Sequence, residues 1–194
     1  MIRNLLRDVE QAGMSSNAFL VTGERPMLVD VGTNFDAVDI VRNYVDDLDG
    51  VVLTHTHYDH VGNLEAVTEA FDVDVWGFDP THEGVDHAIA DGEFVTLGDH
   101  EFEAIHTPGH KDDHLCFYAE STGVLFAGDL VFANGGFGRT DLAEGDRATL
   151  VKSIERLLER TGEVTELYTG HGPSVITNPR HDIETALQAA KMGL

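Results

Sequence analysis

Short apolar runs separated by turn residues characterise the first half of the chain. These runs predict strands at residues 18–22, 27–31, 50–54 and 73–76. The first two strands flank a Gly-Glu-Arg-Pro turn at residues 23–26, which is typical of a hairpin. Between the last two strands, Leu64, Val67 and Phe71 recur at helical spacing and predict a helix. The first half therefore begins with strands and gains a helix later.

The second half repeats this order of elements. Strands are expected at residues 101–106, 115–118, 124–127 and 164–169, and the middle two form a second hairpin. A helix is expected over residues 146–160, followed by Gly162 as a stop. Its apolar stripe consists of Leu150, Val151, Ile154, Leu157 and Leu158. A last helix should begin with Asn178 as the N-cap and Pro179 at the first helical position.

Two halves of this kind suit two packed sheets with helices on the outside. The length of 194 residues suits one domain, and a hydrophobic fraction of 42% is enough for a real core. We therefore expect an α/β protein in which residues 1–194 form a single domain.

The charge balance is strongly acidic, with 35 Asp and Glu against 12 Lys and Arg and a formal net charge of −23. Such a field repels phosphate backbones, so nucleic acid is not an expected partner. The acids are spread along the chain rather than gathered in a tail. Because self-repulsion of this size destabilises a compact chain unless salt screens it, the composition favours a protein of a halophile.

The sequence also bears on the compartment. No apolar run approaches the ~20 residues of a membrane helix, and the N-terminal stretch is too polar for a secretory signal. The single cysteine, Cys116, excludes an internal disulfide, and its apolar surroundings predict a buried thiol. We therefore expect a cytoplasmic protein that does not associate with membranes.

The stretch THTHYDH at residues 54–60 gathers three histidines and a carboxylate directly after a predicted strand. His55 and His57 alternate along the chain and can point the same way. Asp59 and His60 follow where the chain turns into a helix. An HxHxDH match of this kind is expected by chance in well under ~1% of chains, so the stretch predicts a metal site.

Three further candidate ligands follow predicted strands, each directly after a glycine: His110, Asp129 and His171. The glycine lets the backbone pack closely while the next side chain projects. Five histidines and two carboxylates suit Zn, Fe, Mn or Co better than Ca or Mg. Seven ligands exceed the four of a closed structural zinc site and suit two metal ions with a bridging carboxylate.

These residues resemble the metallo-β-lactamase superfamily, with HxHxDH and then His110, Asp129 and His171 in the family order. The resemblance implies an αββα four-layer sandwich with the metal ions at one edge. It also implies the ligand assignment: His55, His57 and His110 for the first metal, Asp59, His60 and His171 for the second, and Asp129 as the bridge.

The segments Thr107–His110 and Gly138–Leu142 resemble the glyoxalase II-like hydroxyacylglutathione hydrolases, especially their short form. The long form carries a C-terminal helical domain that holds glutathione. Here the chain ends soon after His171, so that domain is not expected. The chain reads TPGHKDDH where the family often has TPGHTxGH, so Lys111 and Asp113 depart from the pattern.

Four residues around the ligands are candidates for supporting roles. Asp30 resembles a family carboxylate that orients a ligand histidine, with the capping of a turn as the alternative. His114 is read as a residue next to the ligands and not as a ligand itself. Arg139 and Phe137, in a Gly-rich loop, are candidates for substrate binding, although Arg139 can instead pair with Asp141 and Phe137 can pack in the core.

The resemblance implies a hydrolase in which two divalent metal ions, Zn with Fe or Mn as alternatives, lower the pKa of a bound water from ~15.7 towards ~7. The hydroxide attacks the carbonyl carbon of a small-molecule thioester, and Asp59 or Asp129 holds its proton. The alternatives are a mononuclear-iron persulfide dioxygenase of the same fold and a lactonase. A non-catalytic metal-binding module is the alternative from a different class.

Overall fold

The computed structural model describes residues 1–9 and 14–193, so part of the N-terminal stretch considered above lies outside the described residues. The chain divides into two compact units. The first unit comprises Met1–Ile89 and Val95–Glu101, and the second comprises Ala90–Phe94 and Phe102–Leu194.

The first unit contains one mixed sheet. Its strands, in spatial order, are β1 (Ile2–Asn4), β2 (Phe19–Val21), β3 (Met27–Val29), β4 (Gly50–Val52), β5 (Val75–Gly77) and β6 (His87–Ala88). The neighbours β2 and β3 are antiparallel, which confirms the hairpin, whereas β3 and β4 are parallel. The C-terminal ends of parallel strands meet at one edge of a sheet. The residues that follow β3 and β4 therefore share that edge.

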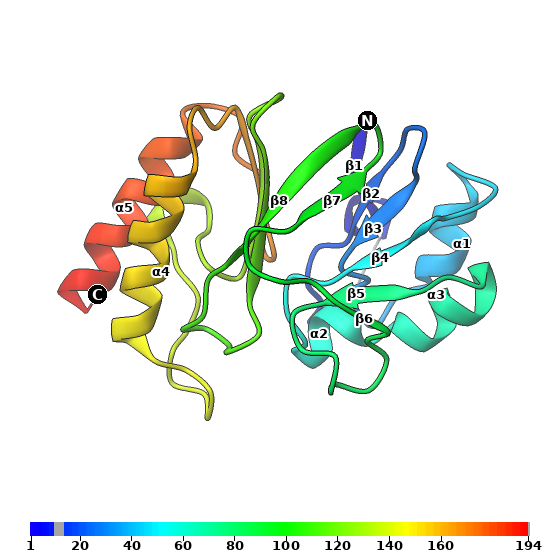
Figure 1. Cartoon of the computed structure of the whole chain (residues 1–194), viewed down its shortest axis with the longest axis horizontal. Coiled ribbons are helices and arrows are strands. Elements are labelled where there is room, and N and C mark those ends of the chain that lie inside the picture. Colours follow the sequence, from blue (N-terminus) through cyan, green and yellow to red (C-terminus); the bar gives the residue numbers. More distant parts are fainter. Residues whose placement is uncertain (10–13, 194) are drawn as a thin grey trace. The chain divides into compact units, whose positions relative to one another are not determined.

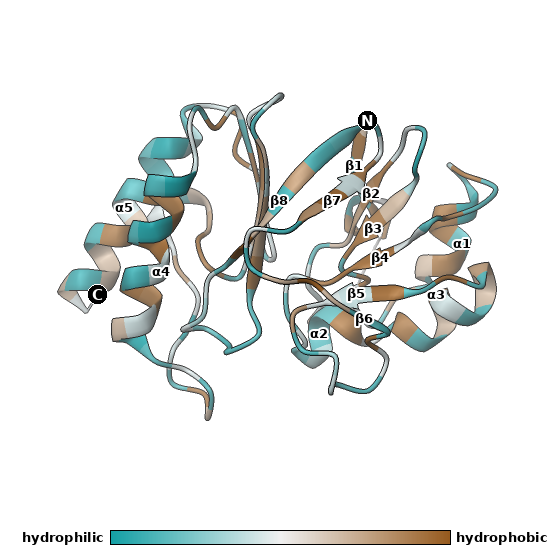
Figure 2. Cartoon of the chain, in the orientation of Figure 1, coloured by the Kyte–Doolittle hydropathy of each residue, from teal (hydrophilic) through white to brown (hydrophobic). Residues whose placement is uncertain are grey.

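Helices flank the strands of the first unit in sequence: η1 (Leu5–Asp8), α1 (Ala37–Arg42), α2 (Tyr58–Val61) and α3 (Leu64–Phe71). The expected helix is confirmed as α3, and its buried residues are Leu64, Val67 and Phe71. The helices α1 and α3 lie side by side (Figure 1). Both contribute to one apolar core with β3 and β4, whose strands are coloured as mainly hydrophobic in Figure 2.

The second sheet has the order β11 (Glu166–Thr169), β10 (Val124–Gly128), β9 (Leu115–Ala119), β8 (His100–His106) and β7 (Phe94–Leu97). The residues of β7 and β8 are divided between the two units. The strands β9 and β10 form the expected antiparallel hairpin, and β10 is parallel to β11. The chain therefore leaves β10 and β11 at the same edge, where the connection from β8 to β9 also runs.

Three helices belong to the second unit: η2 (Ala133–Gly135), α4 (Arg147–Arg160) and α5 (Pro179–Met192). The longer two, α4 and α5, lie side by side in Figure 1 and show both hydrophobic and hydrophilic segments in Figure 2. Their apolar residues join the core of this unit, as the stripe on residues 146–160 predicted. None of the helices in the described part of the chain has the length and apolar character needed to cross a bilayer.

Two helix ends differ from the expectation. The helix α4 begins at the carboxylate of Asp146, which accepts the N–H of Thr149 at 2.6 Å, and ends at Arg160 as predicted, but its C-cap is an extended Thr161 and not Gly162. Asn178 precedes α5 in a left-handed conformation (φ 52°) and makes no capping hydrogen bond through its side chain. Pro179 is the first helical residue, as predicted. Backbone conformation thus fixes this helix start without the expected side-chain cap.

The sequence pattern missed the short elements. The six-residue helix α1, the 3₁₀ helices, and the strands β1, β6 and β7 were not expected. Elements of two to six residues show too few repeats for a hydrophobic period to be read. The prediction of two sheets with helices is nevertheless confirmed.

Candidate metal centre

Four candidate ligands of the first unit lie together just after β4. The Nε2 atom of His55 is 3.1 Å from Nδ1 of His57, and the rings of His55 and His60 are 4.0 Å apart between centroids. The Nε2 atom of His60 is 3.9 Å from a carboxylate oxygen of Asp59. The first turn of α2 brings Asp59 and His60 back towards the extended residues before it. This seven-residue stretch therefore presents its nitrogen and oxygen donors within one small volume.

Asp30 contacts this group from the end of the parallel neighbour β3. One oxygen of its buried carboxylate accepts the N–H of Thr54 at 2.8 Å, and the other lies 2.8 Å from Nδ1 of His60. Because a carboxylate in this network accepts, Nδ1 of His60 carries the proton and Nε2 presents a lone pair. Asp30 has a φ of 57°, a left-handed conformation that is uncommon outside glycine. The predicted contact with a histidine and the alternative contact with a backbone N–H are both present.

Thr54 extends the same network to His55. Its hydroxyl donates to Asp30 at 2.7 Å, so its oxygen can accept from Nδ1 of His55 at 3.2 Å. His55 then also presents its Nε2 lone pair. One carboxylate thus orients two histidines, directly and through a hydroxyl. The residue type of Thr54 did not indicate this role, although Thr54 is the first residue of the THTHYDH stretch.

Ser16 fixes the backbone of the same stretch. Its hydroxyl and its N–H both donate to the carbonyl oxygen of Asp59, at 2.9 and 3.2 Å. The side chain of Asp59 remains 31% exposed. Its neighbour Tyr58 is exposed as well. Asp59 is therefore held at the main chain while its carboxylate stays open to solvent.

Asp129 is the centre of the candidate ligands in the second unit. Its Oδ2 atom lies 3.4 Å from Nε2 of His110 and 3.4 Å from Nε2 of His171. Asp129 and His171 follow the parallel strands β10 and β11, and His110 lies in the connection from β8 to β9. One carboxylate oxygen thus lies close to imidazole nitrogens from two different segments of the chain.

The Gly-rich loop after Asp129 contacts His110 through its backbone. The carbonyl oxygen of Arg139 is 2.8 Å from Nδ1 of His110. A carbonyl only accepts, so Nδ1 carries the proton and Nε2 is free of it. Gly138 allows this approach, because a Cβ at that position would lie 1.9 Å from the carbonyl oxygen of Asp129. The function of this loop that the structure supports is therefore the orientation of His110.

His114 supports the main chain of Asp129. Its ring is fully buried, its Nε2 accepts the backbone N–H of Asp129 at 3.0 Å, and its Nδ1 lies 2.8 Å from the hydroxyl of Thr107. His114 thus contacts the main chain of a candidate ligand, as expected for a residue that lies next to the ligands. Cys116 lies next to the same hydroxyl, and burial raises the pKa of its thiol to about 12. Cys116 is therefore a buried protonated thiol, as the sequence predicted.

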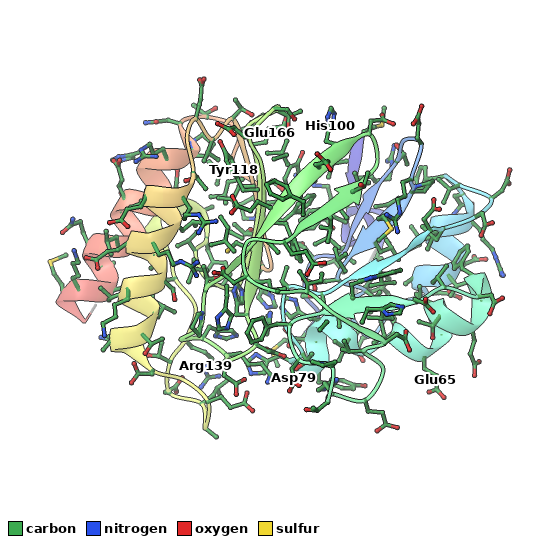
Figure 3. The ribbon with its side chains drawn as sticks, in the orientation of Figure 1. Glu65, Asp79, His100, Tyr118, Arg139 and Glu166 are labelled. Carbon is green, nitrogen blue, oxygen red and sulfur yellow. The ribbon has the colours of Figure 1, made fainter. Side chains whose placement is uncertain are left out.

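Arg139 and Phe137, the two candidate substrate residues, make the contacts of their alternative roles, which are ion pairing and core packing. The guanidinium of Arg139 binds Asp141 through two hydrogen bonds of 2.7 and 2.8 Å, and this pairing lowers the pKa of Asp141 to about 2. Figure 3 shows Arg139 at the opposite end of the second unit from Tyr118 and Glu166. Phe137 packs against the core of that unit. Substrate binding by Arg139 and Phe137 remains a prediction.

Phe132 is an aromatic neighbour of His171 that the sequence pattern did not indicate. Its ring lies 6.1 Å from the ring of His171 in an edge-to-face arrangement. The spacing from Asp129 by three residues was the available signal, since the intervening turn returns the chain towards the strand end. Phe132 therefore flanks His171.

The departure at Lys111 and Asp113 is accommodated by an ion pair. The ammonium group of Lys111 lies 2.8 Å from Glu144 and 3.7 Å from the buried Asp113. Despite partial burial, the hydrogen bond to Glu144 and the nearby carboxylates raise the pKa of Lys111. This pair connects the segment after His110 to the loop that precedes α4.

The donor chemistry fits divalent metal ions. Both groups consist of imidazole nitrogens and carboxylate oxygens, the ligand types that Zn, Fe and Mn accept in proteins. In His55, His60 and His110 the Nδ1 proton is held by an acceptor, so the lone pair of each ring is on Nε2. Such hydrogen bonds from the second ring nitrogen are usual for metal-binding histidines.

Comparison with known proteins agrees with these features. The family model described as the metallo-beta-lactamase superfamily matches residues 12–171. A hydroxyacylglutathione hydrolase of Hahella chejuensis is 33% identical over 142 residues, which cover 70% of this chain and 54% of that protein. The hydroxyacylglutathione hydrolase GloC of Haemophilus influenzae is 33% identical over 144 residues, covering 63% of this chain and 68% of that protein. The chain thus spans about half the length of the first of these relatives.

Solved structures share the fold. A di-iron-bound form of TTHA1623 matches with a TM-score of 0.73 and 30% identity over 93% of this chain and 96% of that one. ETHE1 from Myxococcus xanthus matches with a TM-score of 0.77 and 24% identity over 100% of this chain and 92% of that one, a likeness in fold alone.

The chain belongs to the metallo-β-lactamase superfamily, since the family model matches more than half of its length. This confirms both the resemblance and the α/β fold class of the metallo-β-lactamase type. With its His and Asp donors and with hydroxyacylglutathione hydrolases among its relatives, it is a metallo-hydrolase of that superfamily.

Proposed function

We propose that the chain is a dinuclear-metal hydrolase of small hydroxyacyl thioesters. His55, His57 and His110 would bind one metal ion, and Asp59, His60 and His171 the other. Asp129 would bridge the two ions. The observation that carries the proposal is the position of Asp129, 3.4 Å from the nitrogens of both His110 and His171, one ligand of each proposed metal.

When bound, the metal ions supply a water of lowered pKa, from ~15.7 towards ~7, and an electrophile for the carbonyl oxygen. Side chains of the protein accept and transfer the proton. Asp59 or Asp129 accepts and orients the proton of the attacking water. The C–O bond forms, the C–S bond breaks, and the proton passes to the departing thiolate sulfur. Cys116 does not compete as a nucleophile, because burial raises its pKa to about 12.

The thioester is proposed from the relatives, two of which are named hydroxyacylglutathione hydrolases. The single-domain assignment of residues 1–194 is part of the same proposal.

The first experiment is metal analysis on protein purified in high salt without chelator. We expect close to two metal ions per chain, Zn or mixed with Fe or Mn. The same preparation should release free thiol from 2-hydroxyacyl thioesters of glutathione and of other thiols. His171→Ala should lose the second metal and the activity, whereas His181→Ala, a histidine of α5, should retain both.

The main alternative is the mononuclear-iron persulfide dioxygenase, favoured by the Gly-Arg-Thr-Asp segment at residues 138–141. One iron per chain, with oxygen consumed in the presence of a persulfide and no thioester cleavage, would replace the hydrolase proposal. Turnover of lactones but not thioesters would indicate a lactonase. A folded, metal-loaded protein inactive on all of these would indicate a binding module.

We further propose that the protein works in the cytoplasm of a halophile, because its net charge of −23 demands screening. Unfolding by urea at several KCl concentrations tests this. The free energy of unfolding should rise with KCl well beyond 0.15 M. A stability that stays constant or falls with KCl would contradict the proposal.

A further inference from the structure

A cavity of about 200 Å³ lies in the second unit, and its lining includes none of the candidate metal ligands. It opens between the end of β8 and the exposed side of α4. Its lining consists of His106, Pro108, Thr149, Lys152, Ser153 and Arg156. Three of these six residues are basic types and none is acidic. In a chain with 35 acids against 12 Lys and Arg, this lining has the opposite sign to the rest of the protein.

The wall of the cavity is held by hydrogen bonds between α4 and the segment after β8. The hydroxyl of the buried Ser153 donates to the carbonyl oxygen of Pro108 at 2.6 Å. The guanidinium of Arg156 donates to the carbonyl oxygen of His106 at 2.7 Å and to Asp91 at 2.5 Å. Arg156 is therefore fixed in place, and its charge is largely balanced by Asp91.

Lys152 differs from the other two lysines of the chain. Lys111 lies 2.8 Å from Glu144, and Lys191 lies 2.6 Å from Glu155. Among the described residues, Lys152 has no carboxylate within 4.0 Å. The carboxylate that interacts with Lys152 at longer range is Asp146, whose pKa is lowered by hydrogen bonds from Thr149 and by the charge of this lysine. Its ammonium group is available to a ligand.

We propose that this cavity binds a tetrahedral oxyanion, either free or as the head of a small ester. Lys152 supplies the charge, since a lysine ammonium binds phosphate-type anions as a point charge. The hydroxyl of Thr149 supplies a further donor. The volume of about 200 Å³ falls below the ~300–1,000 Å³ of typical ligand pockets, which suits a small anion. Because Pro108 precedes His110 by two residues, the anion would bind close in sequence to a candidate metal ligand.

The test is a titration with sulfate followed by amide NMR, with KCl replaced by K₂SO₄ at constant ionic strength. Sulfate is the probe because it binds metal ions more weakly than phosphate does. The amide signals of Thr149, Lys152 and Ser153 should shift and saturate. Lys152→Gln should weaken binding by about tenfold or more, as expected for the loss of a hydrogen bond from a charged group.

Two variants control for charge and for shape. Lys191→Gln removes the same charge outside the cavity and should leave the affinity within about twofold. Lys152→Arg keeps the charge and should retain most of the binding. Shifts that do not saturate, or an equal loss in Lys152→Gln and Lys191→Gln, would overturn the proposal.

A parallel titration with methyl phosphate identifies the form of the ligand. Tighter binding of methyl phosphate than of sulfate, again dependent on Lys152, would assign an ester. Equal or weaker binding would assign the free ion. Binding of neither anion by the α4 residues would overturn the site, independently of whether the thioester hydrolase proposal holds.

Discussion

The two units assemble their candidate ligands in opposite ways. In the first unit, four donors come from the seven residues Thr54–His60, and local geometry is enough to bring them together. In the second unit, three donors come from positions 110, 129 and 171, and only the pairing of β8 to β11 places them at one edge. The first group is thus a local motif, and the second is a product of sheet topology.

The units nevertheless share one device for orienting imidazole rings. Each of His60 and His110 has its Nδ1 proton held by a fixed acceptor, the carboxylate of Asp30 or the carbonyl of Arg139. In the first unit the acceptor is a side chain, which a sequence motif can reveal. In the second it is a backbone carbonyl, which any residue provides. The comparison predicts that side-chain substitutions will affect orientation more strongly in the first unit.

The largest expected effect is at the centre of the second group. Replacing a residue that only orients a metal ligand lowers metal affinity by up to about 100-fold. Asp129→Asn changes a proposed ligand itself and should lower the affinity by more than that. Asp59→Asn should cost less, because the side chain of Asp59 is 31% exposed, whereas that of Asp129 is 8% exposed and lies 3.4 Å from two histidine nitrogens. Metal content after dialysis measures both, with circular dichroism to confirm folding. Equal losses of metal in the two variants would contradict the proposed difference between the two carboxylates.

The next effect concerns the orienting carboxylate of the first unit. Asp30→Asn should lower metal affinity by about 10- to 100-fold, because it disturbs His60 directly and His55 through Thr54. Asp99→Asn is the matched control, since Asp99 also accepts a backbone N–H, from Glu24 at 2.7 Å, but contacts no candidate ligand. Competition with a chelator gives the affinities. If Asp99→Asn lowered the metal affinity as much as Asp30→Asn, the orientation of the two histidines would not be the cause of the loss.

A smaller effect is expected at the main-chain support of Asp129. His114→Ala leaves a buried N–H of Asp129 without its acceptor, which should cost about 1–3 kcal/mol of unfolding free energy. His114→Gln, whose side-chain oxygen can accept the same N–H, should recover part of that loss. Urea unfolding in KCl measures both variants. An unchanged stability in His114→Ala would show that the hydrogen bond contributes nothing net.

The smallest effect is at Arg139, whose contact with His110 runs through the backbone. Arg139→Gln should leave metal content unchanged and raise the pKa of Asp141 from about 2 towards its usual ~3.9. The depressed pKa means that the pair is intact above about pH 4 and is lost as the pH falls towards 2. An NMR titration of the Asp141 carboxyl measures the shift. A raised KM with unchanged metal content would add the predicted substrate contact.

The sequence by itself determined most of the larger elements. The helices α3 and α4 were readable because apolar residues repeat over enough positions to define a period, whereas turn residues indicated the hairpins and Asn178 and Pro179 indicated the start of α5. The ligand types were readable as well, because HxHxDH is too specific to arise by chance at a strand end. The family resemblance then supplied the order of His110, Asp129 and His171, which the family match supports as a whole.

Only the tertiary structure decided how those ligands are held. The contacts of Thr54, Ser16 and the carbonyl of Arg139 leave no pattern in a sequence, because hydroxyls and carbonyls occur everywhere along a chain. Likewise, the absence of a close carboxylate at Lys152 within the described part of the chain is visible only once the partners of the other lysines are known. Residue type carries the chemistry of a site. The long-range contacts that orient each group depend on which strands and helices are neighbours in space.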